Sequence, residues 1–375
     1  MKQPYLSVVI PAHNAVSTLR QALEALEASD LARHEFEVLL VDDGSTDETS
    51  VVAAEFCDMV VRLSGKPHGP AFARNRGVEA CRGEVLVFVD ADVVVHPDAL
   101  RRLAERFRSQ PEVSAVFGSY DDRPTSPGIV SQYRNLMHHY VHQRGRGEAE
   151  TFWAGLGAIR RADFLDVGMF DEWHYARPQI EDIELGRRLR LRNHRVMLDP
   201  DIQGTHLKRW TLRQTLLSDF RHRGVPWMWL LLQEGNPARS STLNVQTIEK
   251  VLTALTALAL LMPVLALVFT TWWPLLITAA IAMMILVAKA GFYLFLTRAR
   301  GPFFAAAVMP LHLAYYVGNS LSVFSGWLSH ILFGEPIPPA AASAHAQIGI
   351  ATWPPPPRRS SQSIWEQPRQ GGKAP

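Results

Sequence analysis

The C-terminal third of this 375-residue sequence has almost no charged residues. The whole chain contains 38 Lys and Arg and 36 Asp and Glu, a formal net charge of +2. Residues 1–250 hold 31 of the basic and 34 of the acidic groups, which leaves 7 and 2 for residues 251–375. The stretches 251–288 and 301–334 contain none at all. Because a water-exposed helix needs a polar face, we expect a charged globular part followed by a membrane part.

Cysteine and clustered positive charge are also scarce. Cys57 and Cys81 are the only cysteines, which excludes a disulfide scaffold or a four-cysteine zinc site and predicts two small buried side chains. The first 250 residues have a net charge of −3 and no basic stripe, which argues against nucleic-acid binding. The apolar run after Lys2 is broken by Pro4 and ends at Pro11, unlike an export signal, so we expect the globular part in the cytosol.

Strand-like and helix-like segments alternate from residue 6 to about residue 120. The first helix, with an apolar face at 3, 4 and 7 spacing, is expected to begin at an N-cap formed by Ser17 or Asn14. Repeated strand-helix-strand units predict an α/β fold with a mostly parallel sheet covered on both faces. The expected strands are 6–10, 37–41, 58–63 and 84–89, and the expected helices are about 16–26, 47–56, 70–81 and one that starts near Pro97.

No glycine-rich phosphate loop follows the first expected strand, and no Walker loop is present. Several strands instead end in polar or acidic residues: 11–14 (PAHN), 42–45 (DDGS) and 90–92 (DAD). Because ligands of such sheets bind at the carboxyl ends of the strands, Asp90 and Asp92 are candidates to hold a divalent cation against a diphosphate. An Asp-x-Asp arises by chance about once in such a chain, and 199–201 (DPD) is a second one. We favour the first because it ends a continuous apolar strand.

Three further groups of residues each have two interpretations. Gly155 and Gly157 mark a close approach of the backbone, either to a ligand or within a tight turn. Glu181 and Asp182 at a helix start are either favourable charges on the helix dipole or a general base. The histidines at 138, 139 and 142 are interpreted as an ordinary polar helix face, since no Glu or Cys accompanies them.

The membrane part is expected at 250–334, with spanning segments at 251–271, 273–294 and 304–332. The third segment fits either one tilted helix or a re-entrant pair. Lys289 is expected to snorkel, and Arg298 and Arg300 place their loop on the side of the globular part. Arg and Trp residues within 200–240 suit a membrane surface, and the Pro-rich tail 335–375 is expected to be disordered.

Taken together, the motifs resemble those of family 2 glycosyltransferases of the GT-A fold, over about residues 5–230. Such a resemblance implies a domain at 1–240 that moves a sugar from a nucleoside-diphosphate sugar to an acceptor hydroxyl with inversion at the anomeric carbon. The matching segments are SVVIPAHN (7–14), EVLLVDDGSTDET (37–49), ARNRGVEACRGEVLVFVDADVVV (73–95), FWAGLGAIRR (152–161) and IEDIELGRRL (180–189).

The resemblance also assigns roles to individual residues. Asp182 matches the base that takes the acceptor proton, with Glu181 beside it, and Gly155 and Trp227 are expected on the acceptor side. Asp90, Asp92 and His206 match the residues that hold Mg²⁺ or Mn²⁺. The expected donor-binding residues are Pro11, Ala12, Asn14, Asp42, Asp43, Arg74 and Asp90.

Processive members of the family carry Gln-x-x-Arg-Trp after the base, whereas 209–210 (RW) and 221–227 here lack that Gln. We therefore favour single transfers to a lipid-linked or membrane-proximal acceptor, by a multi-pass protein of the cell inner (plasma) membrane with a cytosolic catalytic domain. A processive polysaccharide synthase and an inactive GT-A membrane scaffold remain the alternatives.

Overall fold

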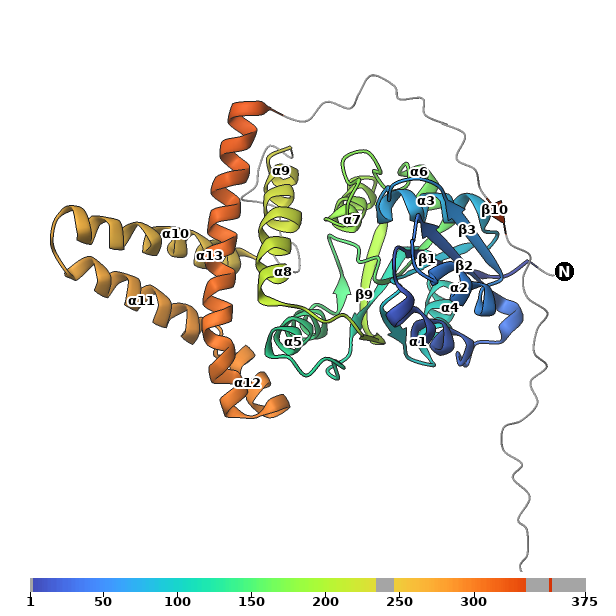
Figure 1. Cartoon of the computed structure of the whole chain (residues 1–375), viewed down its shortest axis with the longest axis horizontal. Helices are drawn as coiled ribbons and strands as arrows, with labels where there is room; N and C mark the ends of the chain where they lie inside the picture. Colours follow the sequence, from blue (N-terminus) through green and yellow to red (C-terminus); the bar gives the residue numbers. More distant parts are fainter. Residues whose placement is uncertain (1–2, 234–245, 335–350, 353–375) are drawn as a thin grey trace, which may run out of the picture.

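A computed structural model describes residues 3–233, 246–334 and 351–352. A mixed sheet with its covering helices lies at one end of the molecule, and α10 (Thr247–Val268) and α11 (Trp273–Ala288) lie at the other, while α12 (Ala290–Arg300) lies between the two ends (Figure 1). Between them lie α5 (Ile129–Arg144), α8 (Leu212–Leu217), α9 (Val225–Gln233) and the long helix α13 (Pro302–Phe333). The charged and the apolar parts of the sequence are therefore separate parts of the structure.

The sheet has the strand order β10-β3-β2-β1-β4-β8-β6-β9-β5, with β7 beside β9. Its strands are β1 (Leu6–Ala12), β2 (Phe36–Asp43), β3 (Met59–Leu63), β4 (Val85–Val89), β5 (Val93–Val95), β6 (Val113–Tyr120), β7 (Gly147–Glu148), β8 (Leu156–Arg160), β9 (Arg195–His206) and β10 (Ala351–Thr352). Outside β10, the expected disordered tail 335–375 lies beyond the described residues.

The prediction of a mostly parallel sheet is correct only in part, since parallel pairing is limited to β3, β2, β1 and β4 and to the pair of β6 and β9. Strands β3, β2, β1 and β4 are parallel neighbours. Strand β8 then pairs antiparallel with both β4 and β6, and β5 and β7 pair antiparallel with β9. A parallel neighbour must be reached through a crossover connection, usually a helix. Strand β8 instead enters the middle of the sheet directly from a loop, so it can run antiparallel to its neighbours.

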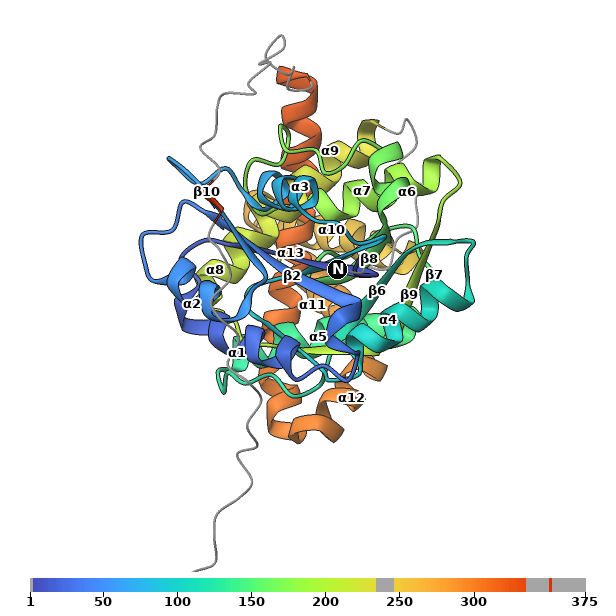
Figure 2. The same ribbon diagram turned by 90° about the vertical axis from the view of Figure 1, so that its right-hand side faces the viewer.

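Helices cover both faces of the sheet (Figure 2). One face packs on α1 (Val16–Glu27), α2 (Thr49–Phe56) and α4 (Ala99–Ser109), and the other on α3 (Pro70–Ala80), α6 (Arg161–Asp166) and α7 (Glu181–Leu191). Alternate residues of β1 divide between the two cores: Val8 and Ile10 lie in the first and Val9 in the second. Short 3₁₀ turn η1 (Arg33–Glu35) precedes β2.

The predicted N-cap of the first helix is wrong, because a neighbouring loop binds the helix amides. The cap residue is Ala15. Its N–H donates to Thr49 Oγ1 at 2.8 Å and the next N–H, from Val16, donates to Asp47 Oδ2 at 3.3 Å. Asn14 has a positive φ of 50° and accepts the Thr46 N–H instead. This exchange joins the loops that follow β1 and β2.

The three predicted membrane segments have different outcomes. Within the described residues, only α10 is by itself long and apolar enough to cross a bilayer, in agreement with the segment 251–271. The segment 273–294 is broken: α11 and α12 pass the same test together but meet at an angle of 61°. The segment 304–332 lies in one continuous helix, α13. This helix is not apolar enough to count as a spanning helix, because Gly, Ser, His and Tyr lower its mean hydropathy.

Lys289, which is expected to snorkel, contacts another helix of the apolar part. It lies at the break between α11 and α12 and forms an ion pair with Glu249 of α10, and the Tyr316 hydroxyl of α13 donates to the same carboxylate at 2.7 Å. Arg300 is the last residue of α12 and donates to Gln132 Oε1 of α5 at 2.8 Å. The helices are thus joined by a partly buried polar contact, and α12 docks on the globular part through α5.

Candidate active site

The loops that follow β1 and β2 form one polar edge of the sheet. Pro11 and Ala12 end β1 in register with Val41 and Asp42. Asp42 accepts the Ser45 N–H at 2.8 Å, and Ser45 Oγ accepts the N–H of Asn14 at 2.9 Å. These expected donor-binding residues therefore lie side by side, with the carboxylate of Asp42 holding the loop in place.

Asp43 organises the next loop of the same edge. Its side chain is buried and accepts the backbone N–H groups of His68 and Gly69 at 2.8 and 2.7 Å. Gly69 has a φ of +103°, and a Cβ there would lie 2.7 Å from the backbone of Ala176. The position therefore requires glycine, and Asp43 fixes the loop that leads into α3.

Arg74 of α3 links two other predicted site residues. Its Nη2 lies 2.8 Å from Asp90 Oδ1 at the end of β4, and its Nη1 lies 2.9 Å from Glu181 Oε1 at the start of α7. Burial alone would lower the pKa of Arg74, but the two carboxylates raise it. Glu181 is buried in this ion pair, so of the two adjacent acids only Asp182 is free to act as a base.

Among the residues that the structure describes, Asp182 has no cationic partner within hydrogen-bond distance. Its Oδ2 accepts the Ala154 N–H at 3.1 Å and its Oδ1 accepts the Ile183 N–H at 2.8 Å. Burial, and then the charge of Glu181, raise its pKa to about 7, while Arg74 acts in the opposite direction. Because a carboxyl with this pKa exchanges protons near neutral pH, it has the property that a general base needs.

Asp92 and His206 face each other at the far side of this edge. His206 Nε2 lies 3.6 Å from Asp92 Oδ2, and His206 Nδ1 lies 2.9 Å from Asn135 Oδ1. The Asn135 oxygen can only accept, so Nδ1 donates to it, and Nε2 is directed toward Asp92. A histidine oriented in this way by an acceptor on its other nitrogen is a typical metal ligand.

The predicted set of three metal ligands is not gathered into one cluster. Across residues 3–233, 246–334 and 351–352, no group of three or more His, Cys, Asp or Glu side chains is arranged to hold a metal ion. One oxygen of Asp90 is bound to Arg74, which leaves Asp92 and His206 as the pair whose donor atoms fit a hard divalent cation. The remaining ligands would have to come from the donor and water.

Gly155 and Gly157 are required by packing against Trp153 and Phe152. A Cβ on Gly155 would lie 2.5 Å from the Trp153 ring, and one on Gly157 would lie 2.3 Å from the Trp153 carbonyl oxygen. Gly155 O also accepts the Asp90 N–H at 3.2 Å. The segment thus fixes the backbone of Asp90 through this hydrogen bond. Trp227 of α9 lies farther along, packed with Tyr175, Ile180 and Leu230 next to the start of α7.

The interpretation of the three histidines as an ordinary polar face is wrong. His142 is buried and its Nδ1 lies 3.0 Å from Gly118 O, while His139 Nδ1 lies 2.8 Å from Tyr120 O. The His138 ring lies 4.4 Å from that of Tyr120, which in turn stacks on His206 at 4.4 Å. His142 is buried and His138 and His139 are half-buried because α5 packs between β6 and the apolar helices, an arrangement that the spacing of the histidines does not reveal.

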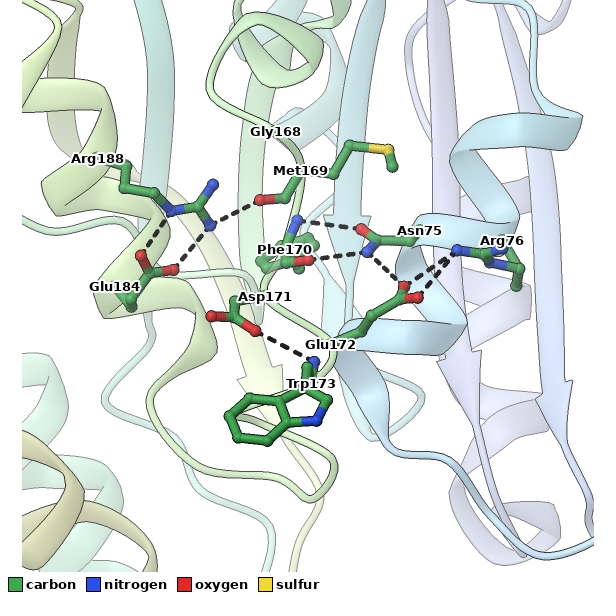
Figure 3. A pocket seen from close by; sticks show the side chains of 10 residues that line it. All are labelled: Asn75, Arg76, Gly168, Met169, Phe170, Asp171, Glu172, Trp173, Glu184 and Arg188. Atoms are coloured by element: carbon green, nitrogen blue, oxygen red, sulfur yellow. Dashed lines mark hydrogen bonds and ion pairs between the residues drawn. The ribbon is translucent and has the colours of Figure 1, made fainter. Parts of the chain in front are cut away.

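A recess of about 430 Å³ lies between α3 and the loop before α7, and its polar groups are paired with each other (Figure 3). Asn75, next to Arg74, bonds both backbone groups of Phe170, at 2.9 and 3.1 Å. Glu172 pairs with Arg76, and Arg188 with Glu184. We interpret these contacts as structural: they hold the loop that leads to Asp182. The charged side chains of the recess are paired, so none is left to bind a ligand.

Two minor predictions are also resolved. The second Asp-x-Asp is neutralised by arginines: Asp199 pairs with Arg106, and Asp201 with Arg146 at 2.7 Å. Both cysteines are free and buried, as expected. Two residues of the site, Asn75 and Asn135, are not predicted from the sequence. The only sequence signal for Asn75 is its position next to Arg74, and Asn135 lies on α5, a helix that the apolar spacing does not predict.

Comparison with known proteins agrees with this geometry. Residues 7–168 match the family model described as Glycosyl transferase family 2. An undecaprenyl-phosphate 4-deoxy-4-formamido-L-arabinose transferase of Pseudomonas fluorescens is 38% identical over 105 residues, 26% of this chain and 31% of that protein. The pre-mycofactocin glycosyltransferase of Mycobacterium tuberculosis is 30% identical over 224 residues, 56% and 45% of the two chains. The chain therefore spans less than half of these relatives.

Among solved structures, a mannosyltransferase from Pyrobaculum calidifontis in complex with GDP-Man and Mn²⁺ has a TM-score of 0.54 over 89% of both chains. With 18% sequence identity, this likeness shows a shared fold only. The predicted GT-A type of architecture is thereby confirmed, with a mixed sheet.

Proposed function

We propose that this chain, which carries a family 2 glycosyltransferase domain over residues 7–168, transfers a sugar from a nucleoside-diphosphate sugar to an acceptor hydroxyl with inversion. The observation that carries the proposal is that two acidic groups come from different elements: Asp182 of α7, whose pKa is raised to about 7, and Asp92 between β4 and β5, which faces His206. Inversion needs attack from the face opposite the leaving diphosphate. Two such sites on either side of a bound sugar meet that requirement.

Asp182 is the proposed general base. In its carboxylate form it would accept the proton of the acceptor hydroxyl while the bond to the anomeric carbon forms. A positioned base contributes typically 10² to 10⁴ in rate. Its two backbone donors, at Ala154 and Ile183, hold the carboxylate in place, and Arg74 lies close enough to keep the pKa from rising further.

Asp92 and His206 are proposed to hold Mg²⁺ or Mn²⁺, and their donor set fits such an ion as described above. A bound divalent cation supplies positive charge that stabilises a departing diphosphate. Support comes from the Mn²⁺ and GDP-Man present in the structure of the Pyrobaculum mannosyltransferase. Arg74 is proposed to lie close to the donor and to oppose the burial that raises the pKa of Asp90.

The proposed acceptor is lipid-linked or lies at a membrane surface. The undecaprenyl-phosphate transferase among the relatives supports this choice, as does the apolar helix α10. We propose that the helical part attaches the catalytic part to the cell inner (plasma) membrane. We favour single transfers over processive synthesis. The described part of the chain has one helix that is by itself long and apolar enough to cross a membrane, which is few for a polymer-extruding channel.

A panel of UDP-, GDP- and dTDP-sugars tests the proposal. The purified full-length protein is incubated with each donor, Mg²⁺ or Mn²⁺ and a lipid extract, and nucleoside diphosphate release is measured. We expect release from one donor class that depends on the metal and is lost in Asp182→Asn with the lipid extract. Absence of release from every donor would contradict the enzyme and favour an inactive scaffold.

A further inference from the structure

A second recess, of about 270 Å³, lies between the loop before α7 and the π-helix η2 (Ser218–Gly224). Its lining is almost entirely basic or amide in character: His174, Ala176, Arg177, Gln179, Arg221 and His222. No acidic side chain lines it. The recess is therefore suited to an anion.

Its arginines have no counterions. Arg177 and Arg221 form no ion pair or hydrogen bond with any other described residue, and both side chains are exposed. The acids nearby are engaged elsewhere: Asp219 pairs with Arg134 at 2.7 Å, and Asp171 with His174 at 2.5 Å. Two unpaired guanidinium groups thus line one recess, and an anion bound between them would relieve their mutual repulsion.

The charges of these residues converge on one side chain. Burial, followed by the charges of Arg221, Arg177 and Arg223, lowers the pKa of His222. His222 is therefore neutral at physiological pH, and its ring can donate one hydrogen bond to an oxyanion without adding to the repulsion. Since water occupies about 30 Å³ per molecule, the recess has room for a phosphate or diphosphate group.

The recess lies between the base and the apolar helices. The loop 174–179 that forms one wall leads directly into α7 and Asp182. The other wall, η2, continues into α9, which packs on α13. A Cβ on Gly224 would lie 2.3 Å from Ser322 Oγ, so η2 is pressed against α13. A π-helix is rare and is often found at functional sites.

We propose that this recess binds the phosphate or diphosphate of a lipid-linked acceptor, with Arg177 and Arg221 as its direct ligands and Arg223 adding to the field. The lipid tail would extend along α9 and α13, and the acceptor hydroxyl would reach Asp182. This inference rests on the proposed function, whose acceptor it narrows to one that carries a phosphate. Arginine is the residue best suited to such a group, since its planar fork binds two oxygens at once.

Binding of farnesyl diphosphate to the detergent-solubilised full-length protein tests the inference without turnover. We expect saturable binding, at least tenfold weaker binding of farnesol, and a loss of at least tenfold in affinity for farnesyl diphosphate in Arg177→Gln/Arg221→Gln. The matched control is Arg213→Gln, an exposed arginine of the neighbouring helix α8 outside the recess, which should bind as the unaltered protein does. Affinity for the nucleotide-sugar donor, and its slow hydrolysis, should be the same in all variants.

Several results would overturn the inference. Equal binding of farnesol and farnesyl diphosphate would show that only the tail is recognised. A loss of donor affinity in the double variant would assign the recess to the donor diphosphate. In a parallel measurement with phosphatidylglycerol vesicles, a loss of vesicle binding in the double variant that still binds farnesyl diphosphate would assign the recess to membrane lipid. Donor hydrolysis by the unaltered protein is measured in parallel, so that failure of the proposed enzyme is distinguished from failure of this recess.

Discussion

The protonation of Asp182 should control the pH dependence of transfer. Its pKa is raised to about 7, so the carboxylate is lost as the pH falls through that value and kcat/KM should decrease tenfold per pH unit below it. Asp182→Asn should retain donor affinity and lose about 10² to 10⁴ in kcat at pH 8. Steady-state kinetics from pH 5 to 9 measure both effects, and a variant with unchanged turnover would refute the role.

The same carboxyl group should lower the free energy of unfolding at pH values where it is ionised. Because its folded pKa lies above the ordinary value, the folded state binds more protons than the unfolded state between about pH 4 and pH 7, and stability falls as pH rises through this window. Asp182→Asn should therefore have a higher Tm than the unaltered protein at pH 8, with the difference shrinking at pH 5. A lower Tm at pH 8 would mean that the carboxylate is held by contacts that favour its charged form.

Asn135 is predicted to be a positioning residue for metal binding. Its oxygen accepts from Nδ1 of His206, so Asn135→Leu should allow the other tautomer and weaken Mn²⁺ binding about 10- to 100-fold. Asn135→Asp keeps an acceptor at the same place and should bind Mn²⁺ nearly as well, since Nδ2 of Asn135 has no hydrogen-bond partner to lose. Titration with Mn²⁺, followed by its electron paramagnetic resonance signal, distinguishes the variants; equal losses would indicate a packing role.

At the scale of secondary-structure elements, the placement of α7 should be sensitive to one glycine. A Cβ on Gly186 would lie 2.1 Å from the backbone nitrogen of Phe152, so Gly186→Ala must move α7 away from the segment that binds Asp182. We expect a destabilisation of about 1–3 kcal/mol and a loss of kcat. Leu191→Ala, at an exposed position of the same helix, is the control and should change neither. Thermal unfolding and donor turnover together provide the measurement.

The sequence predicts best those helices and strands whose apolar pattern is contained within the element itself. Expected strands and helices up to residue 109 agree with β1–β4 and α1–α4 to within a few residues, because buried strands there alternate with amphipathic helices. The remainder depends on tertiary context: β9 contains Pro200 and pairs with strands from three other places. In the site, strand ends predict Asp90 and Asp92, but the Arg74 link to Glu181 spans 107 residues and no local pattern contains it.

At the scale of the whole molecule, the catalytic part and the apolar helices meet where α9 packs on α13. Trp229 Nε1 donates to Gly326 O at 3.0 Å, and a Cβ on Gly326 would lie 2.7 Å from Cβ of Met228. This close contact fixes how η2 and α9 are presented to the helical part. If the acceptor arrives along these helices, the contact should matter for transfer and not for the chemistry of the donor alone.

Gly326→Val should therefore lower transfer to a lipid-linked acceptor by about tenfold or more, since overpacking of about 1–3 kcal/mol would separate α9 from α13. Hydrolysis of the donor by water should be unchanged, because the site residues on α3, α7 and β9 lie in the globular part. Gly318→Val provides a matched control, since it adds the same side chain to the same helix at a position with no atom within 4 Å. Parallel assays of both variants in lipid vesicles separate the two readouts. A similar loss in both would point to a general helix defect, whereas loss of hydrolysis in Gly326→Val alone would mean that the helical part shapes the catalytic site itself.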